Sequence, residues 1–343
     1  MVNKKVLVTG GLGYIGSHTV VELLNAGFKV TILDNLSNSE LAVLDNIEKI
    51  CHDRPVFFEV DISDMAAMKS ALEGKYFSGI IHFAAKKSVG ESVEKPILYF
   101  RNNIDGTINL LDLMTTGLST NLVFSSSCTV YGQPAQLPVS ESSPILPAES
   151  PYGSSKQMCE RILSDAVPAH ERLNAISLRY FNPVGAHHSS LIGEYPKGKP
   201  DNLVPFITQT AAGWREKLSV FGNDYNTADG TAIRDYIHVV DLATAHIKAL
   251  ERQLKGVHVK PYEFFNLGSG RGYSVLEIIK TFEEVNKVKL NYQITDRRSG
   301  DIEKIYADTH LAEKELNWKA RLNLEDMMSS AWNWQKTLLT PKS

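Results

Sequence analysis

The amino-acid sequence predicts an α/β protein in which a Rossmann-like doubly wound parallel sheet is joined to a second, smaller α/β substrate domain. Three observations lead to this prediction. Short β-branched runs alternate with longer helical patterns through the first half, a glycine-rich turn connects the first run to the first helix, and the composition changes after residue 182. Strands that alternate with helices in this way are typical of βαβ units and a parallel sheet.

Several expected strands of the first half are apolar on both faces, as parallel strands covered by helices should be. The strands are expected at residues 5–10, 29–34, 55–61, 79–85, 121–127 and 174–182. Helices are expected near residues 16–27, 40–50, 64–73, 96–116 and 152–167. The proline-rich stretch 133–151 shows neither pattern, and loops of that length are usually functional.

The second half begins with a segment, 185–202, that is rich in Gly, Pro, His, Lys and Ser. Strands are then expected at 218–222, 262–268 and 289–294, and helices near 203–213, 239–252, 274–286, 309–316 and 323–338. We therefore expect two domains, residues 1–182 and residues 183–343. The pattern leaves open whether the chain crosses back to the first domain.

The composition argues against several classes of function. A net charge of −3 disfavours nucleic-acid binding, which requires a basic surface. Three widely spaced cysteines, Cys51, Cys128 and Cys159, do not resemble a secreted disulfide framework. The pair His187–His188 has no partners at ligand spacing, so no metal is expected. Without a signal peptide or a run of roughly 18 apolar residues, we expect a soluble, cytoplasmic protein that binds no membrane.

The turn "VLVTGGLGYIGSHT" predicts a phosphate-binding site. Gly10, Gly13 and Gly16 lie between the first strand and the first helix, where glycines let the backbone approach a pyrophosphate. Asp34 ends the second strand, eighteen residues after Gly16. A carboxylate there accepts hydrogen bonds from an adenosine ribose and repels a 2′-phosphate, so NAD is favoured over NADP. The alternative is an ordinary turn with an aspartate that caps a helix.

The stretch "SPYGSSK" places Tyr152 and Lys156 four residues apart, on one face of an expected helix. An ammonium group near the phenol would favour its ionised form and make it a better base. Chance alone would supply about one such spacing in a chain with 13 tyrosines and 36 Lys and Arg residues. The spacing therefore needs its structural context before it indicates catalysis.

Further motifs resemble the extended short-chain dehydrogenase/reductase family. They are "TGGLGYIG", "DISD", "HFAAKKSVGES", "FSSSCTVYG" and "PYGSSK". The later motifs "LRYFNPVGAH", "GTAIRDYIHVVDLA" and "RRSGDIEKIYAD" narrow the resemblance to the UDP-glucose 4-epimerase (UDP-galactose 4-epimerase) family. The resemblance extends from residue 5 to about residue 335, and these later motifs are far more specific than the glycine turn.

The resemblance implies a set of NAD contacts. Besides the three glycines and Asp34, it assigns to the cofactor Tyr14, Ile15, Asn35, Asn38, Asp61, Ile62, Phe83, Ala84, Lys87, Asn102, Ser127, Tyr152, Lys156, Tyr180 and Phe181. Asn35 and Asn38 would hold the adenosine ribose, and Lys87 would reach ribose or phosphate oxygens. Without the resemblance, Lys87 and Asn102 would be equally plausible as surface residues.

The resemblance also implies the catalytic set. Ser127, Tyr152 and Lys156 would converge over the nicotinamide, with Tyr152 as the acid–base group and Ser127 bonded to the reacting oxygen. Lys156 and the positive nicotinamide ring would lower the pKa of Tyr152. The alternative is a strand-end serine beside a tyrosine on a helix surface. Related 4,6-dehydratases carry an Asp-Glu pair where this sequence has Cys128 and Thr129, so dehydration lacks its acid.

A UDP-sugar substrate is implied as well. The residues assigned to it, besides Ser127 and Tyr152, are Asn182, Asn202, Leu203, Ser219, Phe221, Arg234, Arg298, Asp301 and Ile305. Arg234 and Arg298 would hold the diphosphate, because guanidinium groups match phosphate oxygens. Arg234 could instead pair with Asp235. Ile305 would line the hexose pocket, where its size should disfavour an N-acetyl group.

The expected activity is an NAD-dependent interconversion of UDP-glucose and UDP-galactose, an isomerase reaction of galactose metabolism. The resemblance implies oxidation at C4, a 4-keto intermediate and hydride return to the opposite face. One alternative is an epimerase of UDP-N-acetylglucosamine and UDP-N-acetylgalactosamine, or one that accepts both sugar types. Another is an NAD-binding regulatory protein without turnover. The family is usually homodimeric, and helices 96–116 and 152–167 would form the contact.

Overall fold

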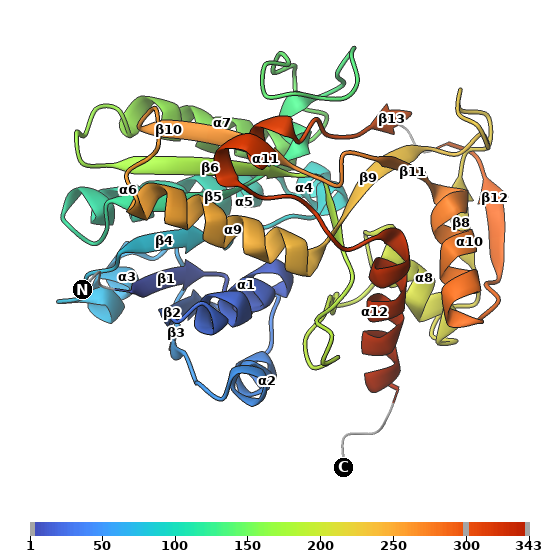
Figure 1. Ribbon diagram of the computed structural model, residues 1–343, viewed down its shortest axis with the longest axis horizontal. Coiled ribbons are helices and arrows are strands. Elements are labelled where there is room, and N and C mark those ends of the chain that lie inside the picture. Colours follow the sequence, from blue (N-terminus) through green and yellow to red (C-terminus); the bar gives the residue numbers. More distant parts are fainter. Residues whose placement is uncertain (1–3, 298–301, 340–343) are drawn as a thin grey trace.

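The computed structural model describes residues 4–297 and 302–339 (Figure 1). Its centre is a seven-stranded sheet in the order β10-β6-β5-β4-β1-β2-β3, and all neighbouring strands in it are parallel. The strands are β1 (Lys5–Thr9), β2 (Lys29–Asp34), β3 (Val56–Glu59), β4 (Gly79–His82), β5 (Asn121–Ser127), β6 (Asn174–Tyr180) and β10 (Tyr262–Leu267). The strand order reverses between β1 and β4, where doubly wound sheets bind their ligands. The α/β fold-class prediction is confirmed.

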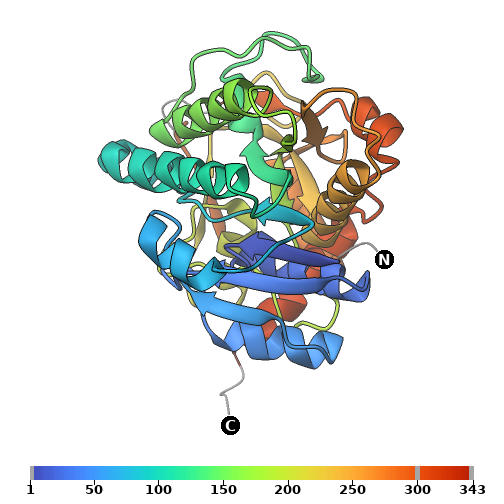
Figure 2. The ribbon, with the colours of Figure 1, turned by 90° about the vertical axis from the view of Figure 1, so that its left-hand side faces the viewer.

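Helices cover both faces of this sheet (Figure 2). One face packs against α1 (Tyr14–Asn25), α2 (Ala42–Cys51) and α9 (Val239–Leu254). The other packs against α3 (Met65–Leu72), α6 (Gly106–Thr115) and α7 (Pro151–Ala166). The central strands are buried on both faces by these helices, which explains their nearly continuous apolar sequence.

The helix predicted at 96–116 is present over residues 96–115, but its middle turn is π-helical. The chain forms α4 (Val89–Glu94) and α5 (Pro96–Phe100), then a π-helical turn (Arg101–Asp105), and only then α6. The buried Asn103 in this turn bonds the backbone of Lys86 and the side chain of Ser155. A tertiary contact thus interrupts the helix, and such π turns often occur at functional sites.

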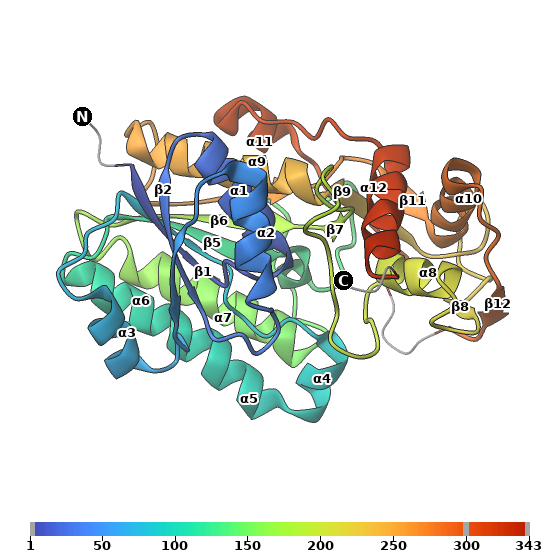
Figure 3. The same cartoon turned by 90° about the horizontal axis from the view of Figure 1, so that it is seen from below.

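The second half contributes two small sheets beside the large one (Figure 3). One contains β7 (Asn182–Val184), β9 (Ile233–His238), β11 (Gly272–Ser274) and β13 (Lys304–Ile305); the other pairs β8 (Leu218–Phe221) with β12 (Tyr292–Thr295). They pack with α8 (Leu203–Ala211), α10 (Val275–Asn286) and α12 (Leu324–Thr337), while α11 (His310–Leu316) lies against the large sheet.

The chain returns to the large sheet after residue 183. Helix α9 shares a core cluster with α1 through Leu242 and Val20, and β10 pairs with β6 so that Leu267 lies opposite Tyr180. The strand expected at 262–268 therefore extends the first sheet rather than the smaller ones. No signal in the sequence distinguishes these destinations, because a buried parallel strand looks the same in either.

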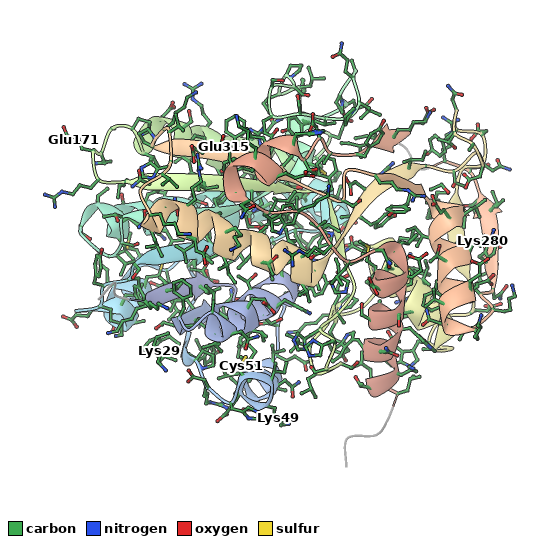
Figure 4. All side chains as sticks on the ribbon, in the orientation of Figure 1. Lys29, Lys49, Cys51, Glu171, Lys280 and Glu315 are labelled. Carbon is green, nitrogen blue, oxygen red and sulfur yellow. The ribbon has the colours of Figure 1, made fainter. Side chains whose placement is uncertain are left out.

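The proline-rich stretch forms no helix or strand between residues 133 and 150. It is held to the protein body at Val139, whose N–H donates to Tyr306 O at 2.9 Å and whose carbonyl accepts from Asn266 Nδ2 at 2.9 Å. All three cysteines are free; Cys51 lies on α2 at the periphery (Figure 4). Within the described part of the chain, no helix is long and apolar enough to cross a membrane.

Candidate active site

A cavity of about 1290 Å³ opens at the carboxyl ends of the large sheet's strands. Its walls are the glycine turn after β1, the loops after β2 and β4, the end of β5, the start of α7 and residues 180–183. Residues 189–197 and the end of α12 close it from the side of the smaller sheets. Sites for one drug-sized ligand measure roughly 300–1,000 Å³. This cavity therefore has room for a dinucleotide and a second ligand.

The glycine turn is shaped for a ligand that approaches the backbone. Gly10 has φ = +68°, and a Cβ there would lie 2.7 Å from Ala84 N. A Cβ on Gly16 would lie 2.1 Å from Gly10 O, so any side chain at Gly16 would push the turn open. Helix α1 starts directly after Gly13 without a side-chain cap. Its first N–H groups therefore border a concave backbone surface suited to a phosphate.

Asp34 is buried and lines the cavity at the end of β2. One carboxylate oxygen accepts from Leu12 N at 3.0 Å, and the other accepts from Leu36 N at 3.0 Å and Ser39 Oγ at 2.7 Å. The side chain thus joins the glycine turn to the next loop as well as facing the cavity. Asp34 caps neither α1 nor α2, so the helix-capping alternative is wrong, and its role as a ribose acceptor stays a prediction.

The remaining residues predicted for the cofactor lie around the same cavity, with one exception. Those that line it are Gly10, Gly13, Tyr14, Ile15, Gly16, Asp34, Asn35, Asn38, Ile62, Phe83, Ala84, Lys87, Asn102, Ser127, Tyr152, Lys156, Tyr180 and Phe181. Asp61 does not line it and instead accepts a 2.8 Å hydrogen bond from Asn35 Nδ2. Burial raises the pKa of Asp61, but hydrogen bonds from Ser63 and Asn35 outweigh burial and lower it.

Ser127 and Tyr152 lie together in the wall of the cavity. Ser127 ends β5, and Tyr152 is the second residue of α7, whose N-terminus is capped by Ser150 Oγ accepting from Gly153 N at 3.2 Å. Ser127 lies close enough to the Tyr152 hydroxyl to lower the pKa of that group. The strand end and the helix start are thus combined into one polar pair, which answers the question of context that the spacing left open.

Lys156 is buried one helical turn after Tyr152 and donates to Ser125 O at 2.7 Å, with its ammonium 4.8 Å from the Phe124 ring centre. Burial lowers the pKa of Lys156 to about 8. Burial also raises the pKa of Tyr152 to about 12, and the bond from Ser127 opposes it. The expected lowering of the Tyr152 pKa is therefore not a property of the protein groups alone, because desolvation outweighs them.

A buried polar network behind this pair was not predicted. Glu160, on the same face of α7 as Tyr152 and Lys156, accepts from Ser126 Oγ at 2.6 Å and binds Arg179 through both carboxylate oxygens at 2.9 and 2.6 Å. Burial lowers the pKa of Arg179, but Glu160 outweighs it and holds the pKa above its usual value. The only sequence signal was the spacing of Tyr152, Lys156 and Glu160 by four residues each.

Only some of the residues predicted for the substrate line the cavity. Asn182 and Asn202 line the cavity, whereas Leu203, Ser219, Phe221, Arg234 and Ile305 do not. Arg298 and Asp301 lie outside the described residues. The carboxylate of Asp235 accepts from the backbone N–H groups of Ser269, Gly270 and Ala307 and from Ser269 Oγ. Burial raises the pKa of Asp235 to about 6, and these bonds counteract it.

Cys128 lines the cavity directly after Ser127. Burial raises the pKa of its thiol to about 12, so it stays protonated at neutral pH. Neither this thiol nor the following Thr129 can supply the carboxylic acid that a dehydration requires. Among residues 4–297 and 302–339, no group of three or more His, Cys, Asp or Glu side chains is arranged to hold a metal ion.

The fold and this cavity define a dinucleotide-binding enzyme of the extended short-chain dehydrogenase/reductase type, and a family model described as GDP-mannose 4,6 dehydratase matches residues 7–331. UDP-glucose 4-epimerase from Haemophilus influenzae is 50% identical over 333 residues, 96% of this chain and 97% of that protein. The UDP-glucose 4-epimerase of Stenotrophomonas maltophila, solved with NAD and formylated UDP-arabinopyranose, has 46% identity and a TM-score of 0.94, covering 98% of this chain and 99% of its own. The UDP-glucose 4-epimerase of Bifidobacterium longum, solved with NAD+ and UDP, has 45% identity and a TM-score of 0.91. The match covers 97% of this chain and 98% of that chain. The chain belongs to the UDP-glucose 4-epimerase family, and the predicted family is confirmed.

Proposed function

We propose that this protein interconverts UDP-glucose and UDP-galactose with NAD as its cofactor. The observation that carries the proposal is the Ser127–Tyr152 pair in the wall of a cavity that the glycine turn also lines. An acid–base group thereby stands where a hydride acceptor bound on that turn would meet a sugar hydroxyl. The high sequence identity to curated UDP-glucose 4-epimerases over nearly the whole chain supports the same reaction.

The residues present suit NAD. Its pyrophosphate would lie on the glycine turn, where a Cβ on Gly10 or Gly16 would collide with backbone, and its adenosine ribose would lie against Asp34. The Asp34 carboxylate would repel a 2′-phosphate, which favours NAD over NADP. When bound, NAD supplies reversible acceptance of hydride from C4 of the sugar. The site then needs only to orient the sugar and move one proton.

Tyr152 would take the C4 hydroxyl proton as the alcohol is oxidised and return it when the 4-keto sugar is reduced on its other face. Ser127, whose proximity lowers the pKa of Tyr152, would hold the reacting oxygen. The nearby Lys156 ammonium and a cationic nicotinamide ring would both stabilise the phenolate. Both charges would oppose burial, which raises the pKa of Tyr152 to about 12.

We assign the UDP half of the substrate to the side of the smaller sheets. Asn182 and Asn202 line the cavity there, and Arg234 with Arg298 remains our proposal for the diphosphate. Leu203, Ser219 and Phe221 follow as proposed nucleotide contacts, and Asp301 as a ribose contact. Asn182 is oriented by its Nδ2, which donates to Asp235 O at 3.0 Å. A fixed amide of this kind preorganises a polar contact.

A coupled assay on UDP-glucose, UDP-galactose and their two N-acetylated counterparts tests the proposal, with the NAD content of the purified protein measured beforehand. We expect bound NAD and rapid turnover of the first two sugars. Bound NAD without turnover of any of them would instead support the regulatory protein considered above.

An epimerase of N-acetylated UDP-sugars is the second candidate, and Ile305 bears on it. Ile305 is buried in a cluster with Phe181 and Val139, and Cys128 packs against this cluster. Phe181 and Cys128 line the cavity, so Ile305 supports its wall from behind. Extra atoms in a packed site cost about 1–3 kcal/mol, so N-acetyl sugars should react at least roughly tenfold more slowly.

Ile305→Ser is therefore expected to raise kcat/KM for the N-acetyl sugars by about tenfold, with little change for UDP-galactose. Val139→Ser is the matched control, because Val139 belongs to the same cluster without lining the cavity. It should destabilise the protein without any gain on N-acetyl sugars. Equal kcat/KM for both sugar types in the unchanged protein would show that Ile305 does not select, and would favour the second candidate.

We propose that the protein forms a homodimer through α4, α5, α6 and α7. These helices expose Val89, Val93, Ile97, Leu98, Ile108 and Met158. Exposed apolar side chains on helices that pack together, as α4, α5 and α7 do, are typical of a protein–protein contact. Sedimentation analysis should give the mass of two 38.1 kDa chains, and Ile97→Asp should reduce it to one. Val259→Asp changes an apolar exposed residue outside these helices and should leave the dimer mass unchanged. A monomeric mass for the unchanged protein would refute the proposal.

A further inference from the structure

Glu194 is a carboxylate in a cavity that we propose takes two diphosphate ligands. Its side chain is only 12% exposed, and it lines the cavity from the segment 189–197. A negative charge repels phosphates and weakens their binding unless its contacts with neighbouring residues compensate for the repulsion. The contacts of Glu194 with Lys87 and Asn202 provide such a compensation.

One oxygen of Glu194 bridges the two sides of the cavity. Glu194 Oε1 lies 3.2 Å from Lys87 Nζ, which follows β4 on the proposed cofactor side. The same oxygen accepts from Asn202 Nδ2 at 2.8 Å, which precedes α8 on the proposed substrate side. Lys87 is half exposed, so its ion pair is weak. The bond to Asn202 is charge-assisted and therefore the stronger of the two.

The Asn202 side chain bonds Glu194 instead of capping helix α8. It occupies the N-cap position of α8 with extended backbone, where an asparagine side chain ordinarily accepts a hydrogen bond from the helix. Here the side chain makes no capping bond and turns to Glu194. Removal of the Glu194 carboxylate would let it swing back to cap the helix.

The position of Glu194 is itself fixed from a third direction. Trp334, near the end of α12, donates from Nε1 to Glu194 O at 2.9 Å. The indole packs on Gly193 so closely that a Cβ there would lie 2.4 Å from Trp334 Cγ. On the other side, Asn46 Nδ2 donates to Leu191 O at 2.9 Å. The carboxylate is therefore held by backbone that is anchored on both halves of the molecule.

From this arrangement we infer that Glu194 is a positioning residue, which holds the Asn202 amide toward the UDP-sugar and ties it to Lys87 on the cofactor side. The inference rests on the proposed function, because it takes the UDP half of the substrate as the ligand of Asn202. Glu194 touches neither reacting atom, and its effect passes through Asn202.

Titration of the purified holoenzyme with UDP tests the inference. Glu194→Ala should raise the Kd for UDP roughly tenfold, the size expected when one charge-assisted hydrogen bond no longer orients a ligand group. Its KM for the UDP-sugar should rise similarly, with kcat within about twofold because Ser127 and Tyr152 are untouched. Glu194→Gln keeps an acceptor for Asn202, so its Kd for UDP should stay within about twofold of the unchanged protein.

Thermal stability separates positioning from a merely structural role. In Glu194→Ala, Asn202 regains its capping bond, so the Tm should not fall. In an Asn202→Ala background, the further change Glu194→Ala should not alter the Kd for UDP. Glu94→Ala, at another carboxylate lining the cavity, is the control and should not weaken UDP binding.

Three results would overturn the inference. Tighter UDP binding in both Glu194 variants would make the carboxylate only a repulsive charge. An unchanged Kd with a lower Tm would make it structural, and additive effects of Glu194→Ala and Asn202→Ala would uncouple the two residues. Absence of UDP binding in the unchanged protein would instead refute the proposed function, so the two failures are distinguishable.

Discussion

Tyr152→Phe should lower kcat for UDP-galactose by about 10²–10⁴, the usual contribution of a general acid or base. The change removes only the phenolic hydroxyl, whose pKa Ser127 lowers. The ring, half-buried at the start of α7, keeps its packing, so folding and NAD content should not change. The measurement is kcat in the coupled assay, combined with spectrophotometric determination of bound NAD.

Tyr195→Phe provides the matched control, because Tyr195 lines the cavity rim and is 46% exposed. Loss of that hydroxyl should leave kcat within about twofold. If Tyr152→Phe retained near-normal turnover, Tyr152 would have no part in proton transfer, and the Ser127–Tyr152 pair could no longer carry the proposed function.

Glu160→Ala should lower the free energy of unfolding by about 3–5 kcal/mol, the cost of leaving a buried charge without its partner. Arg179 would lose both bonds to Glu160 while its side chain remains only 4% exposed. Ser126, directly before Ser127, would also lose its acceptor. Urea-induced unfolding measures the loss, and kcat should fall as well because β5 and α7 are no longer tied together.

Glu251→Ala is the control for this variant. Glu251 pairs with Lys248 and Lys255 on the surface, where the loss of an ion pair should cost less than about 1 kcal/mol. The double variant Glu160→Leu/Arg179→Met should regain most of the stability, because apolar residues can replace both charges. A loss below 1 kcal/mol in Glu160→Ala would show that Arg179 is satisfied by Tyr131, to which it donates at 2.9 Å.

The cofactor half of the site was predictable because its signals are local. The glycine turn lies within seven residues, and Asp34 ends the next strand. A parallel sheet brings the carboxyl ends of its strands to one edge, so residues that follow separate strands meet without further information. Phe83 and Tyr180 reach the same cavity in this way, although nearly a hundred residues separate them.

The positions of the residues predicted for the substrate were harder to foresee, since several of them lie on small strands whose pairing follows no comparable rule. Ile305 is an example. Its place in the motif suggested the cavity wall, yet β13 places it behind Phe181. The return of α9 and β10 to the large sheet could not be predicted for a similar reason. Apolar periodicity shows that a segment is buried, but it does not show which element packs against that segment.

By itself, the sequence determined the class of fold, the glycine turn and the position of Asp34 at the end of the second strand, and it predicted that Ser127, Tyr152 and Lys156 act together. These features depend on chain geometry over a few residues and on the regular layout of a parallel sheet. Only the tertiary structure decided that Glu160 meets Arg179 and that Glu194 holds Asn202. Such contacts depend on which side chains remain unsatisfied after packing, because a buried polar group must find a partner wherever the fold provides one.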